Sequence, residues 1–486
     1  MTGILSFGAY IPRMRLQRKA VVAAHEWFNP GLKAFAKGER SFANWDEDSI
    51  TMAVEASRDA LSGRDRSGLG ALFMASTTMP FADRQNAVIV KEALNLDSDL
   101  STLDITGSQR TGVSALIQAL ATGNSGSAPV LCVASEKPRA KPASEAELVS
   151  GAAAAALLVG SGPVIARHVV SHSLAADFID HFRAERRQFD YEWEARWVRE
   201  EGYGKLAPRA IAAALSRAGL RPDEIDVFIL PATIRGVTSS VAKQCGIRSE
   251  AVADDLAAVV GHAGTAQPLV LLAQALERAE PGQRILLVGF GSGCDVVLFE
   301  RTDLQPSPGP SLGVRGWLAR RKPETNYNRY LFLSGEVEFE RGMRAEFDQK
   351  QPLTALWRNR RTVLGLVGGR CKETGTVQFP RSEIGVSPNS RSVGTQEDYF
   401  LAERTAKILT HTADHLTYTP DPPAYYGMIE FEEGGRMNAE FCDIDADDIS
   451  VGREMRMMFR IKAQDELRGF TRYFWKAAPL GRQMGA

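Results

Sequence analysis

Short apolar runs alternate with amphipathic stretches over the first 302 residues. Four continuous apolar runs have the length of buried strands, at residues 71–77, 129–135, 226–232 and 284–293. Such runs are typical of strands that are covered by helices on both faces. Between them, residues 46–61 and 203–220 carry apolar positions at helical spacing. This alternation of strands and helices predicts an α/β layered architecture.

Residues 46–61, with the sequence DEDSITMAVEASRDAL, form a clear amphipathic pattern. Ile50 and Val54 fall on one helical face, and Asp46 and Asp48 precede them as candidate N-terminal caps. We therefore expect a helix with an acidic N-terminus over this range.

Two further runs depart from the alternation. Residues 181–201 mix charged with aromatic side chains, and we interpret them as a solvated helix. Residues 150–160 read SGAAAAALLVG and are only about half as long as the ~20 residues that a membrane-spanning helix needs. We interpret this second run as a buried strand.

The C-terminal part of the chain has a different pattern. Residues 303–327 are rich in Pro, Gly and basic residues, which predicts a linker. Beyond it, residues 425–444 form two alternating runs joined by a Glu-Gly-Gly turn, and residues 453–462 form another alternating run. The final third is therefore expected to be a small, mostly β domain.

Composition limits the class of protein. The chain has 486 residues, is 44% hydrophobic and carries a formal net charge of −1. This length allows two or three domains, and the near-neutral charge argues against a nucleic acid or an anionic membrane surface as the main partner. We expect a small-molecule substrate or a protein partner instead.

Cysteine usage indicates a reducing compartment. The five cysteines are far apart, form no CxxC pair and follow no secretory signal: Cys132, Cys245, Cys294, Cys371 and Cys442. Reduced thiols of this kind are typical of a cytoplasmic protein. We expect none of them to bind a metal ion.

One stretch has the layout of a catalytic turn. Residues 103–120 read LDITGSQRTGVSALIQAL, an apolar start, a tight polar turn and then a helix. A helix N-terminus favours thiolates and developing oxyanions. The turn, however, carries Ser108 and Gln109 where a reactive group is expected.

At this point the chain resembles a known family. The first 300 residues are similar to the 3-hydroxy-3-methylglutaryl-CoA synthase branch of the thiolase superfamily, especially its archaeal type. The similarity lies in DEDSITMAVEASRDAL, STTMPFADRQNAVIVKEALNL, ASEKPRAKPASEAELVSGAAAAALLVG, GLRPDEIDVFILPA and EPGQRILLVGFGSGCD. The resemblance implies a five-layered αβαβα thiolase fold with similar halves at residues 1–165 and 166–302. It also implies a homodimer, and coenzyme A or an acyl-CoA as substrate rather than a tightly bound cofactor.

The rest of the chain resembles the DUF35 family, in which a zinc ribbon precedes an OB-fold. GMIEFEEGGRMNAEFCDIDADDISVGREMRMMF and GFTRYFWKAAP carry this similarity. It implies a helical segment with a degenerate ribbon at residues 328–390 and an OB-fold at residues 391–486. DUF35 ribbons usually present two CxxC pairs, the ordinary zinc signature.

Here the ribbon retains only Cys371. Thr374 replaces the second cysteine, and the later pair is expected near Ile384 and Ser387. One thiolate cannot hold a structural zinc ion, so the sequence predicts a metal-free remnant.

Three catalytic positions of the family are altered. Synthases of this branch use a cysteine five positions after an aspartate, and counting from Asp104 places that slot at Gln109. An amide cannot form a thiolate or carry an acyl group, so an acyl-enzyme at this position is excluded. Ser108 is the alternative nucleophile. The family's acid/base glutamate falls at Thr77 and its first histidine at Ile229.

Two features of the family site remain. His262, in VVGHAGTAQP, occupies a position where the synthases have Asn and degradative thiolases have a Gly-His motif. It is the expected hydrogen-bond donor or proton shuttle. Gly291, Ser292 and Gly293 stand where the superfamily supplies an oxyanion amide, and Thr77 is the further candidate for substrate binding.

The other histidines of this half lack such a context. His168, His172 and His181 have no motif around them and are interpreted as surface or core histidines. In the family, the region that matches residues 181–201 covers the acyl pocket. Its aromatic side chains are therefore candidates to line a site for an aryl substrate.

The expected activity is that of an acyltransferase without a cysteine acyl-enzyme. The enzyme would make or break a carbon–carbon bond of a β-keto acid or acyl-CoA, for example by retro-Claisen attack of free CoA, and would not be a true HMG-CoA synthase. The alternatives are retro-aldol cleavage of a β-hydroxyacyl-CoA, decarboxylation of a β-keto acid, and a non-catalytic scaffold that binds acyl-CoA.

Overall fold

A computed structural model describes residues 1–124, 126–306, 311–346 and 350–481. Their contacts divide the chain into two compact units. The first unit contains residues 1–44, 48–88 and 96–330; the second contains residues 45–47, 89–95 and 331–486. Each unit is described separately below.

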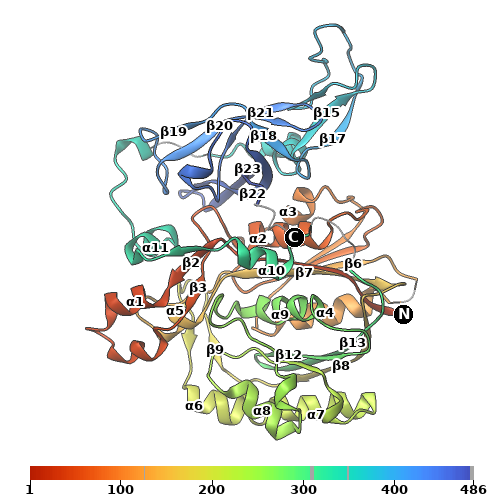
Figure 1. The fold of residues 1–486 in the computed structure, drawn as a ribbon, viewed down its shortest axis with the longest axis vertical. Helices are drawn as coiled ribbons and strands as arrows, with labels where there is room; N and C mark the ends of the chain where they lie inside the picture. The colour runs from red at the N-terminus through yellow and green to blue at the C-terminus, as the bar shows by residue number, and fades with distance from the viewer. Residues whose placement is uncertain (125, 307–310, 347–349, 482–486) are drawn as a thin grey trace. The chain divides into compact units, whose positions relative to one another are not determined.

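The strands of the first unit's main sheet follow the order β11-β12-β13-β8-β1-β7-β6-β4-β5. Their bounds are β1 Thr2–Tyr10, β4 Ala71–Ala75, β5 Ser101–Ile105, β6 Val130–Glu136, β7 Ala153–Ser161, β8 Ala166–Ala175, β11 Val227–Ile229, β12 Arg284–Phe290 and β13 Gly293–Arg301. β8 pairs with β1 at Gly3–Arg167 and Ile4–Ala166. On either side of this junction the strands lie in two separate layers (Figure 1).

Helices form the other three layers of this unit. α4 (Thr111–Thr122) and α9 (Gln267–Leu276) lie between the two strand layers and contact both of them (Figure 1). α2 (Ser49–Ala60) and α10 (Gly313–Ala319) pack on β1, and α7 (Leu206–Ala218) packs on β8 and β13 next to α8 (Val237–Cys245). The expected αβαβα thiolase-like fold is therefore confirmed. The two central helices are buried because each has a sheet on both sides.

The apolar runs form strands as expected. Residues 71–77, 129–135, 150–160, 226–232 and 284–293 contain β4, β6, β7, β11 and β12. The short connections of this unit contain further elements, including the three-stranded sheet β14-β2-β3. They are α1 Arg18–His25, β2 Met14–Gln17, β3 Glu39–Ser41, α5 Glu145–Val149 and β14 Lys322–Glu324. Two further helices, α3 (Asn86–Ala93) and α11 (Tyr327–Leu333), each contain residues of both units.

The helix expected at residues 46–61 begins later than its acidic pattern indicated. Asp48 is the N-cap: its side chain accepts from the Thr51 amide at 2.8 Å, and the Thr51 hydroxyl oxygen accepts from the Asp48 amide at 2.9 Å. Asp46 is not a cap but pairs with Lys476 at 3.0 Å, within the second unit. One acidic residue therefore stabilises the helix, and the other neutralises a buried lysine.

The prediction that residues 303–327 form a linker is wrong for residues 313–324. Residues 313–319 form α10, and residues 322–324 form β14, which pairs in parallel with β2. Trp317 is buried with its ring centroid 4.5 Å from that of Tyr10. The Asp59 carboxylate accepts from the Leu312 and Gly313 amides at 2.7 and 2.9 Å. Long-range contacts of this kind are invisible to a composition argument. Residues 307–310 lie outside the described part.

The solvated helix expected at residues 181–201 is also wrong for most of its length. The segment forms a two-stranded hairpin, β9 (His181–Phe182) and β10 (Tyr191–Glu192), followed by α6 (Ala195–Trp197) and a π-helix at Val198–Tyr203. Its charged side chains pair across the hairpin, for example Arg183 with Asp190. These pairs stabilise a turn that the charge pattern alone assigned to a helix face.

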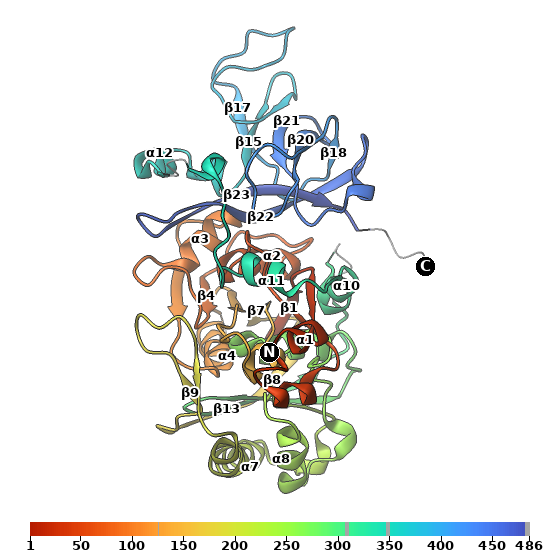
Figure 2. The same cartoon turned by 90° about the vertical axis from the view of Figure 1, so that its left-hand side faces the viewer.

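The second unit contains the expected β domain. β20 and β21 form the hairpin expected at residues 425–444, and β22 is the strand expected at residues 453–462. The six strands are β18 Ala406–Ile408, β19 Thr412–Asp414, β20 Ala424–Phe431, β21 Arg436–Glu440, β22 Glu454–Asp465 and β23 Phe470–Pro479. A three-stranded sheet, β16-β15-β17, and two short helices precede them: α12 Leu353–Arg358, α13 Arg360–Val363, β15 Val367–Cys371, β16 Val377–Gln378 and β17 Gln396–Phe400. Figure 2 shows these strands in blue.

In the described ranges, no helix combines the length and apolar character that crossing a bilayer requires.

Candidate active site

The turn before α4 positions Gln109. β5 ends at Ile105, the chain reverses through Gly107 with φ +103°, and α4 begins at Thr111. The Gln109 side chain lies at the start of this buried helix, where the partial positive charge of the helix is located. Its Nε2 atom is 3.0 Å from Nε2 of His181, on β9. The structure thus joins the expected catalytic turn to a histidine that the sequence left without a role.

Asp180 orients His181. Oδ2 of Asp180 is 2.9 Å from Nδ1 of His181, and both side chains are largely buried. Burial by itself lowers the pKa of His181, but the hydrogen bond and charge of Asp180, together with Asp190 and Glu192, outweigh burial and raise it. A carboxylate accepts only, so Nδ1 carries a hydrogen. Nε2 therefore faces Gln109 as the atom that gains or loses a proton.

Glu136 is a second buried ionisable group near this turn. It is the last residue of β6, and its carboxylate accepts from the Thr77 amide at 2.9 Å, the Thr77 hydroxyl at 3.1 Å and the Thr78 hydroxyl. Burial raises the pKa of Glu136 and outweighs these three hydrogen bonds, which lower it. Arg183 donates to the Thr77 carbonyl and so holds in place the loop that carries Thr77 and Thr78.

Thr77 therefore has a different role from the expected one. Thr77 was expected to bind the substrate or an oxyanion, but its amide and its hydroxyl both donate to Glu136. A donor that already serves a buried carboxylate is not available to an oxyanion. In this structure Thr77 holds Glu136 rather than an oxyanion.

Gly264 brings Gln109 and Glu136 together. A Cβ atom built on Gly264 would lie 2.7 Å from Oε1 of Gln109 and 2.8 Å from Cγ of Glu136. Gly264 also has φ +47°, in the left-handed region that favours glycine. Absence of a side chain here is what allows the amide and the carboxylate to approach the same loop.

His262 lies two residues before this glycine. Its Nδ1 accepts from the Gly264 amide at 3.1 Å, so a neutral ring has its hydrogen on Nε2. Burial and the neighbouring His181 lower the pKa of His262 to about 4. At neutral pH it is therefore an uncharged hydrogen-bond donor. The donor role expected from the sequence fits this geometry, whereas proton shuttling near pH 7 does not.

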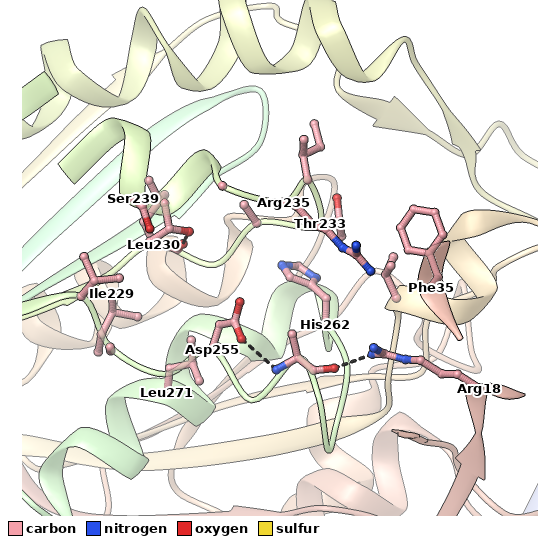
Figure 3. A pocket seen from close by; sticks show the side chains of 18 residues that line it. Arg18, Phe35, Ile229, Leu230, Thr233, Arg235, Ser239, Asp255, His262 and Leu271 are labelled. Atoms are coloured by element: carbon pink, nitrogen blue, oxygen red, sulfur yellow. Dashed lines mark hydrogen bonds between the residues drawn. The ribbon is translucent and has the colours of Figure 1, made fainter. Parts of the chain in front are cut away.

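A cavity of about 190 Å³ opens beside His262. Figure 3 shows four residues that line this cavity: Arg18 and Phe35 from the N-terminal segment, and Arg235 and His262 from two later loops. The Arg235 guanidinium stacks on the Phe35 ring at 4.8 Å from its centroid. Burial and two neighbouring arginines, Arg40 and Arg235, lower the pKa of Arg18 to about 10, although Asp255 partly offsets them. Positive charge is thus concentrated at this cavity.

Ser108 does not have the surroundings of a nucleophile. Its hydroxyl donates to the Gly291 carbonyl at 2.6 Å. A serine needs a base to accept its proton, and a backbone carbonyl cannot do so. The expectation that Ser108 is the alternative nucleophile is therefore not supported by this geometry.

The glycine-rich turn at residues 291–293 lies against the same helix start. A Cβ atom on Gly291, which has φ +144°, would lie 3.1 Å from the Gln109 amide nitrogen. However, the Gly291 amide donates to the Gly293 carbonyl at 3.0 Å, and the Ser292 carbonyl accepts from Ala176. The Gly291 amide is therefore not an available oxyanion donor. The backbone amide of Gln109 has no acceptor within the described residues. It is therefore better placed than the Gly291 amide to donate to an oxyanion.

The five cysteines lie elsewhere. Cys132, Cys294, Cys371 and Cys442 are buried, and Cys245 is partly buried. Burial raises the pKa of Cys132 to about 12. Cys294 belongs to the apolar core that α7 and α8 cover. None of these thiols occupies the start of α4.

The segment expected to be a ribbon contains one thiol among hydroxyl groups. Sγ of Cys371 lies 3.4 Å from the Ser392 hydroxyl and 3.2 Å from the Thr395 hydroxyl. The hydroxyls that contact this thiol thus belong to Ser392 and Thr395, and not to the expected positions Ile384 and Ser387. Over the described residues, no group of three or more His, Cys, Asp or Glu side chains is placed to bind a metal ion.

Sequence reasoning missed three groups: Asp180, His181 and Glu136. His181 was hidden because its partner Gln109 lies 72 positions away and no motif surrounds it. Glu136 follows directly after the apolar run of β6, and a carboxylate at the end of a buried strand is a signal that could have found it. The exposed aromatics of the hairpin, Phe182 and Tyr191, pack on each other at 5.3 Å rather than lining the cavity beside His262.

Family comparisons agree with both units. Residues 215–297 match the family described as 3-oxoacyl-[acyl-carrier-protein (ACP)] synthase III C terminal. Residues 401–460 match the family described as ChsH2, C-terminal OB-fold domain.

Curated relatives cover about two thirds of the chain. The hydroxymethylglutaryl-CoA synthase of Caldivirga maquilingensis is 28% identical over 338 residues, which is 68% of this chain and 96% of that protein. The protein of the same name from Methanothermobacter thermautotrophicus is 29% identical over 324 residues, with 63% and 92% covered.

Solved structures share the fold. An HMG-CoA synthase complexed with CoA superposes with a TM-score of 0.60 at 18% identity, over 72% of this chain and 95% of that chain. The 3-oxoacyl-[acyl-carrier-protein] synthase III from Aquifex aeolicus gives a TM-score of 0.54 at 20% identity, over 62% of this chain and 100% of that chain. The chain is therefore similar to archaeal hydroxymethylglutaryl-CoA synthases over about two thirds of its length, shares the fold of these thiolase-superfamily enzymes, and carries a segment that matches an OB-fold domain.

Proposed function

We propose that this enzyme breaks or forms a carbon–carbon bond of a β-keto acid or acyl-CoA, with free CoA as the acyl acceptor and without a cysteine acyl-enzyme. The observation that carries the proposal is the position of Gln109, at the start of α4 and in contact with His181. This helix start can stabilise an oxyanion, but its side chain cannot carry an acyl group.

Direct attack by CoA follows from the lack of an acyl carrier. The Ser108 hydroxyl is bonded to a carbonyl, and the cysteines lie outside the turn. In retro-Claisen cleavage the thiol of CoA attacks the β-carbonyl, the bond to the α-carbon breaks, and the α-carbon takes up a proton. The thiol replaces the enzyme nucleophile, so no covalent intermediate with the protein is needed.

The surrounding groups can polarise the carbonyl. The backbone amide of Gln109 and the Nε2 hydrogen of neutral His262 are uncharged donors near the same turn. Donors fixed in advance in a largely buried site are worth several kcal/mol each, on the order of 2.7–4 for one oxyanion contact. Arg18 and Arg235 at the cavity suit the phosphates of CoA.

HMG-CoA synthesis itself is not the proposed reaction, although the curated relatives carry that name. The slots of its nucleophile, acid/base and first histidine hold Gln109, Thr77 and Ile229. The Thr77 hydroxyl serves Glu136, and Ile229 is buried in β11. Without an acyl-enzyme the two-stage condensation has no first stage.

Retro-aldol cleavage of a β-hydroxyacyl-CoA is the second candidate. It needs a base for the hydroxyl proton and no thiol nucleophile. Glu136, a buried carboxylate whose pKa is raised, favours this alternative. The reaction would proceed without added CoA, which separates it from thiolysis.

A panel assay tests these functions. The purified full chain is incubated with β-keto acids, their CoA thioesters and β-hydroxyacyl-CoAs, with and without CoA, and products are identified by mass spectrometry. Cleavage of a β-keto substrate that requires CoA supports the proposal. Cleavage of a β-hydroxyacyl-CoA without CoA supports the retro-aldol alternative, and loss of carbon dioxide without CoA indicates a decarboxylase. Tight acyl-CoA binding with no turnover indicates a scaffold and contradicts the proposal.

The assembly is proposed from the resemblance alone. We expect a homodimer, which sedimentation of the full chain measures directly. We also expect no tightly bound cofactor, and a location in the cytoplasm.

A further inference from the structure

We propose that His181, held by Asp180, is the proton-transfer group of this site: its Nε2 takes the proton of the CoA thiol and later delivers it to the departing carbon. The inference rests on the proposed function, which names CoA as the attacking group. It assigns a role to a residue that the family pattern does not mark in this sequence.

Hydrogen-bond geometry fixes which atom reacts. Oδ2 of Asp180 lies 2.9 Å from Nδ1 of His181, so Nδ1 keeps its hydrogen whether the ring is neutral or charged. The opposite atom, Nε2, points toward Gln109 at the start of α4. The acceptor lone pair of neutral His181 is therefore directed at the place where a thiolase-like site receives its substrate.

Gln109 adapts to both charge states of His181. When the ring is neutral, the Gln109 NH₂ group donates to Nε2, and Oε1 of Gln109 is left buried without a partner. When Nε2 carries a proton, rotation of the amide by half a turn presents Oε1 as its acceptor. A buried unpaired oxygen costs about 1–3 kcal/mol, so protonation of His181 relieves a penalty that the neutral state leaves.

The surrounding charges stabilise the imidazolium. Asp180 contacts the ring directly, Glu192 lies on the second strand of the same hairpin, and Asp190 directly precedes that strand. The loop before α9 carries His262, whose pKa responds to His181 and which is uncharged at neutral pH. Three carboxylates against one neutral imidazole explain why the His181 charge is favoured despite burial.

The other two groups are less suited to this proton. His262 uses Nδ1 as an acceptor for the Gly264 amide and resists protonation. Glu136 already accepts from Thr77 and Thr78. Among the three groups, only His181 combines a stabilised charged form with a single partner at its acceptor atom, the Gln109 side chain, which can turn to accept the proton instead.

The step balances without an outside reagent. The S–H bond of CoA breaks and an N–H bond forms on Nε2, which leaves a thiolate beside an imidazolium. The thiolate forms a C–S bond with the β-carbonyl carbon, and the bond to the α-carbon breaks with its electron pair on that carbon. The Nε2 proton then forms the new C–H bond, so His181 returns to its neutral state.

The test measures the thiol directly and does not require a known substrate. CoA is mixed with excess full-chain protein, and the thiolate is followed by its ultraviolet absorbance during a pH titration. A free thiol has a pKa near about 8.5, and a neighbouring imidazolium lowers it. We expect the thiol of CoA bound to the wild-type protein to have a pKa at least about one unit below that of free CoA.

Two variants and one control locate the effect. His181→Gln should return the thiol titration to that of free CoA, and Asp180→Asn should give an intermediate value because it removes the charge that stabilises the imidazolium. His411→Gln, on the surface of the second unit, should match the wild type. Calorimetry with CoA establishes that each variant still binds the ligand.

Each outcome decides one proposal. An unperturbed thiol in the wild-type complex, or an equal perturbation in His181→Gln, overturns the assignment of His181. A perturbed thiol that depends on His181, together with no turnover on the substrate panel, supports His181 and rejects the proposed reaction. Where a substrate is found, His181→Gln should lower kcat by about 100- to 10,000-fold and remove the acid limb of the pH–rate profile. Retention of that limb overturns the role.

Discussion

The carboxylate of Glu136 accepts two hydrogen bonds from Thr77, one from the backbone amide at 2.9 Å and one from the hydroxyl at 3.1 Å. The family resemblance predicts that Thr77 replaces an acidic group. In the structure a carboxylate is supplied beside Thr77 by Glu136, at the end of β6, and Thr77 donates to it.

Thr77→Val tests this relationship. The variant keeps the amide but removes the hydroxyl donor, so we expect the free energy of unfolding to fall by about 1–3 kcal/mol at neutral pH. The loss should shrink in acid, where Glu136 is protonated and needs the donor less. Urea denaturation at neutral and acidic pH measures both values. Thr417→Val removes the exposed hydroxyl that donates to Asp414 and should have a much smaller effect.

Gly264→Ala should disturb the site through a single atom. Its Cβ would approach Oε1 of Gln109 at 2.7 Å, and the backbone has φ +47°. We expect a loss of stability of about 1–3 kcal/mol and at least about a tenfold loss of turnover or of CoA thiol perturbation. Gly219→Ala is the matched control, because Gly219 also has positive φ but open space around it. Equal effects of the two variants would show that strain alone matters.

Gln109→Cys should restore an acylatable site. A thiol at the start of α4, beside His181, is expected to have a pKa below its ordinary value. After incubation with acetyl-CoA, mass spectrometry should show one added acetyl group, located on residue 109 by peptide mapping. The wild type provides the background from the other cysteines, and Gln109→Ala should remain unmodified. No acetylation of the cysteine variant would contradict the placement of residue 109.

Protonation of His262 should weaken the fold in acid. Its folded pKa of about 4 lies below the ordinary value of 6.5, so the unfolded chain binds the proton more readily. The stability that comes from the neutral ring is complete above pH 6.5 and is lost as the pH falls toward 4. His262→Gln should therefore flatten the pH dependence of Tm in this window. The corresponding change in the free energy of unfolding is at most about 3 kcal/mol. A variant with the slope of the wild type would show that His262 is not held neutral.

Zinc content tests the ribbon. We expect less than stoichiometric zinc in the purified protein, because Cys371 is surrounded by hydroxyls. The triple variant Thr374→Cys, Ser392→Cys, Thr395→Cys should bind one zinc ion, with a Tm that falls when a chelator is added. The variant Thr374→Cys, Ile384→Cys, Ser387→Cys uses the positions that spacing alone suggested and should bind no zinc. Stoichiometric zinc in the wild type would contradict the metal-free ribbon.

Local patterns were sufficient for much of the fold. The apolar runs at β4, β6, β7, β11 and β12 predicted strands because continuous apolar character signals coverage on both faces. The helix after Asp48 was predicted because its cap and its apolar face are both local features. The β hairpin at residues 425–444 had a turn signal between alternating strands.

The same reasoning failed where stability comes from distant partners. Trp317 and Asp59 organise the segment that composition assigned to a linker. Arg183 and Asp190 pair across a hairpin that charge pattern assigned to a helix. In both cases tertiary contacts outweigh local composition.

The site shows the same division. The sequence by itself determined that residue 109 stands in the turn before a helix and cannot be acylated, because the helical pattern and the side-chain chemistry are both local. Only the tertiary structure decided what faces it. His181 contacts Gln109, which is 72 positions away in the sequence. Glu136, at the end of β6, lies against Gly264 in the loop before α9. A proton-transfer site is a matter of distances of about 3 Å, and those distances are set by packing between elements rather than by any periodicity along the chain.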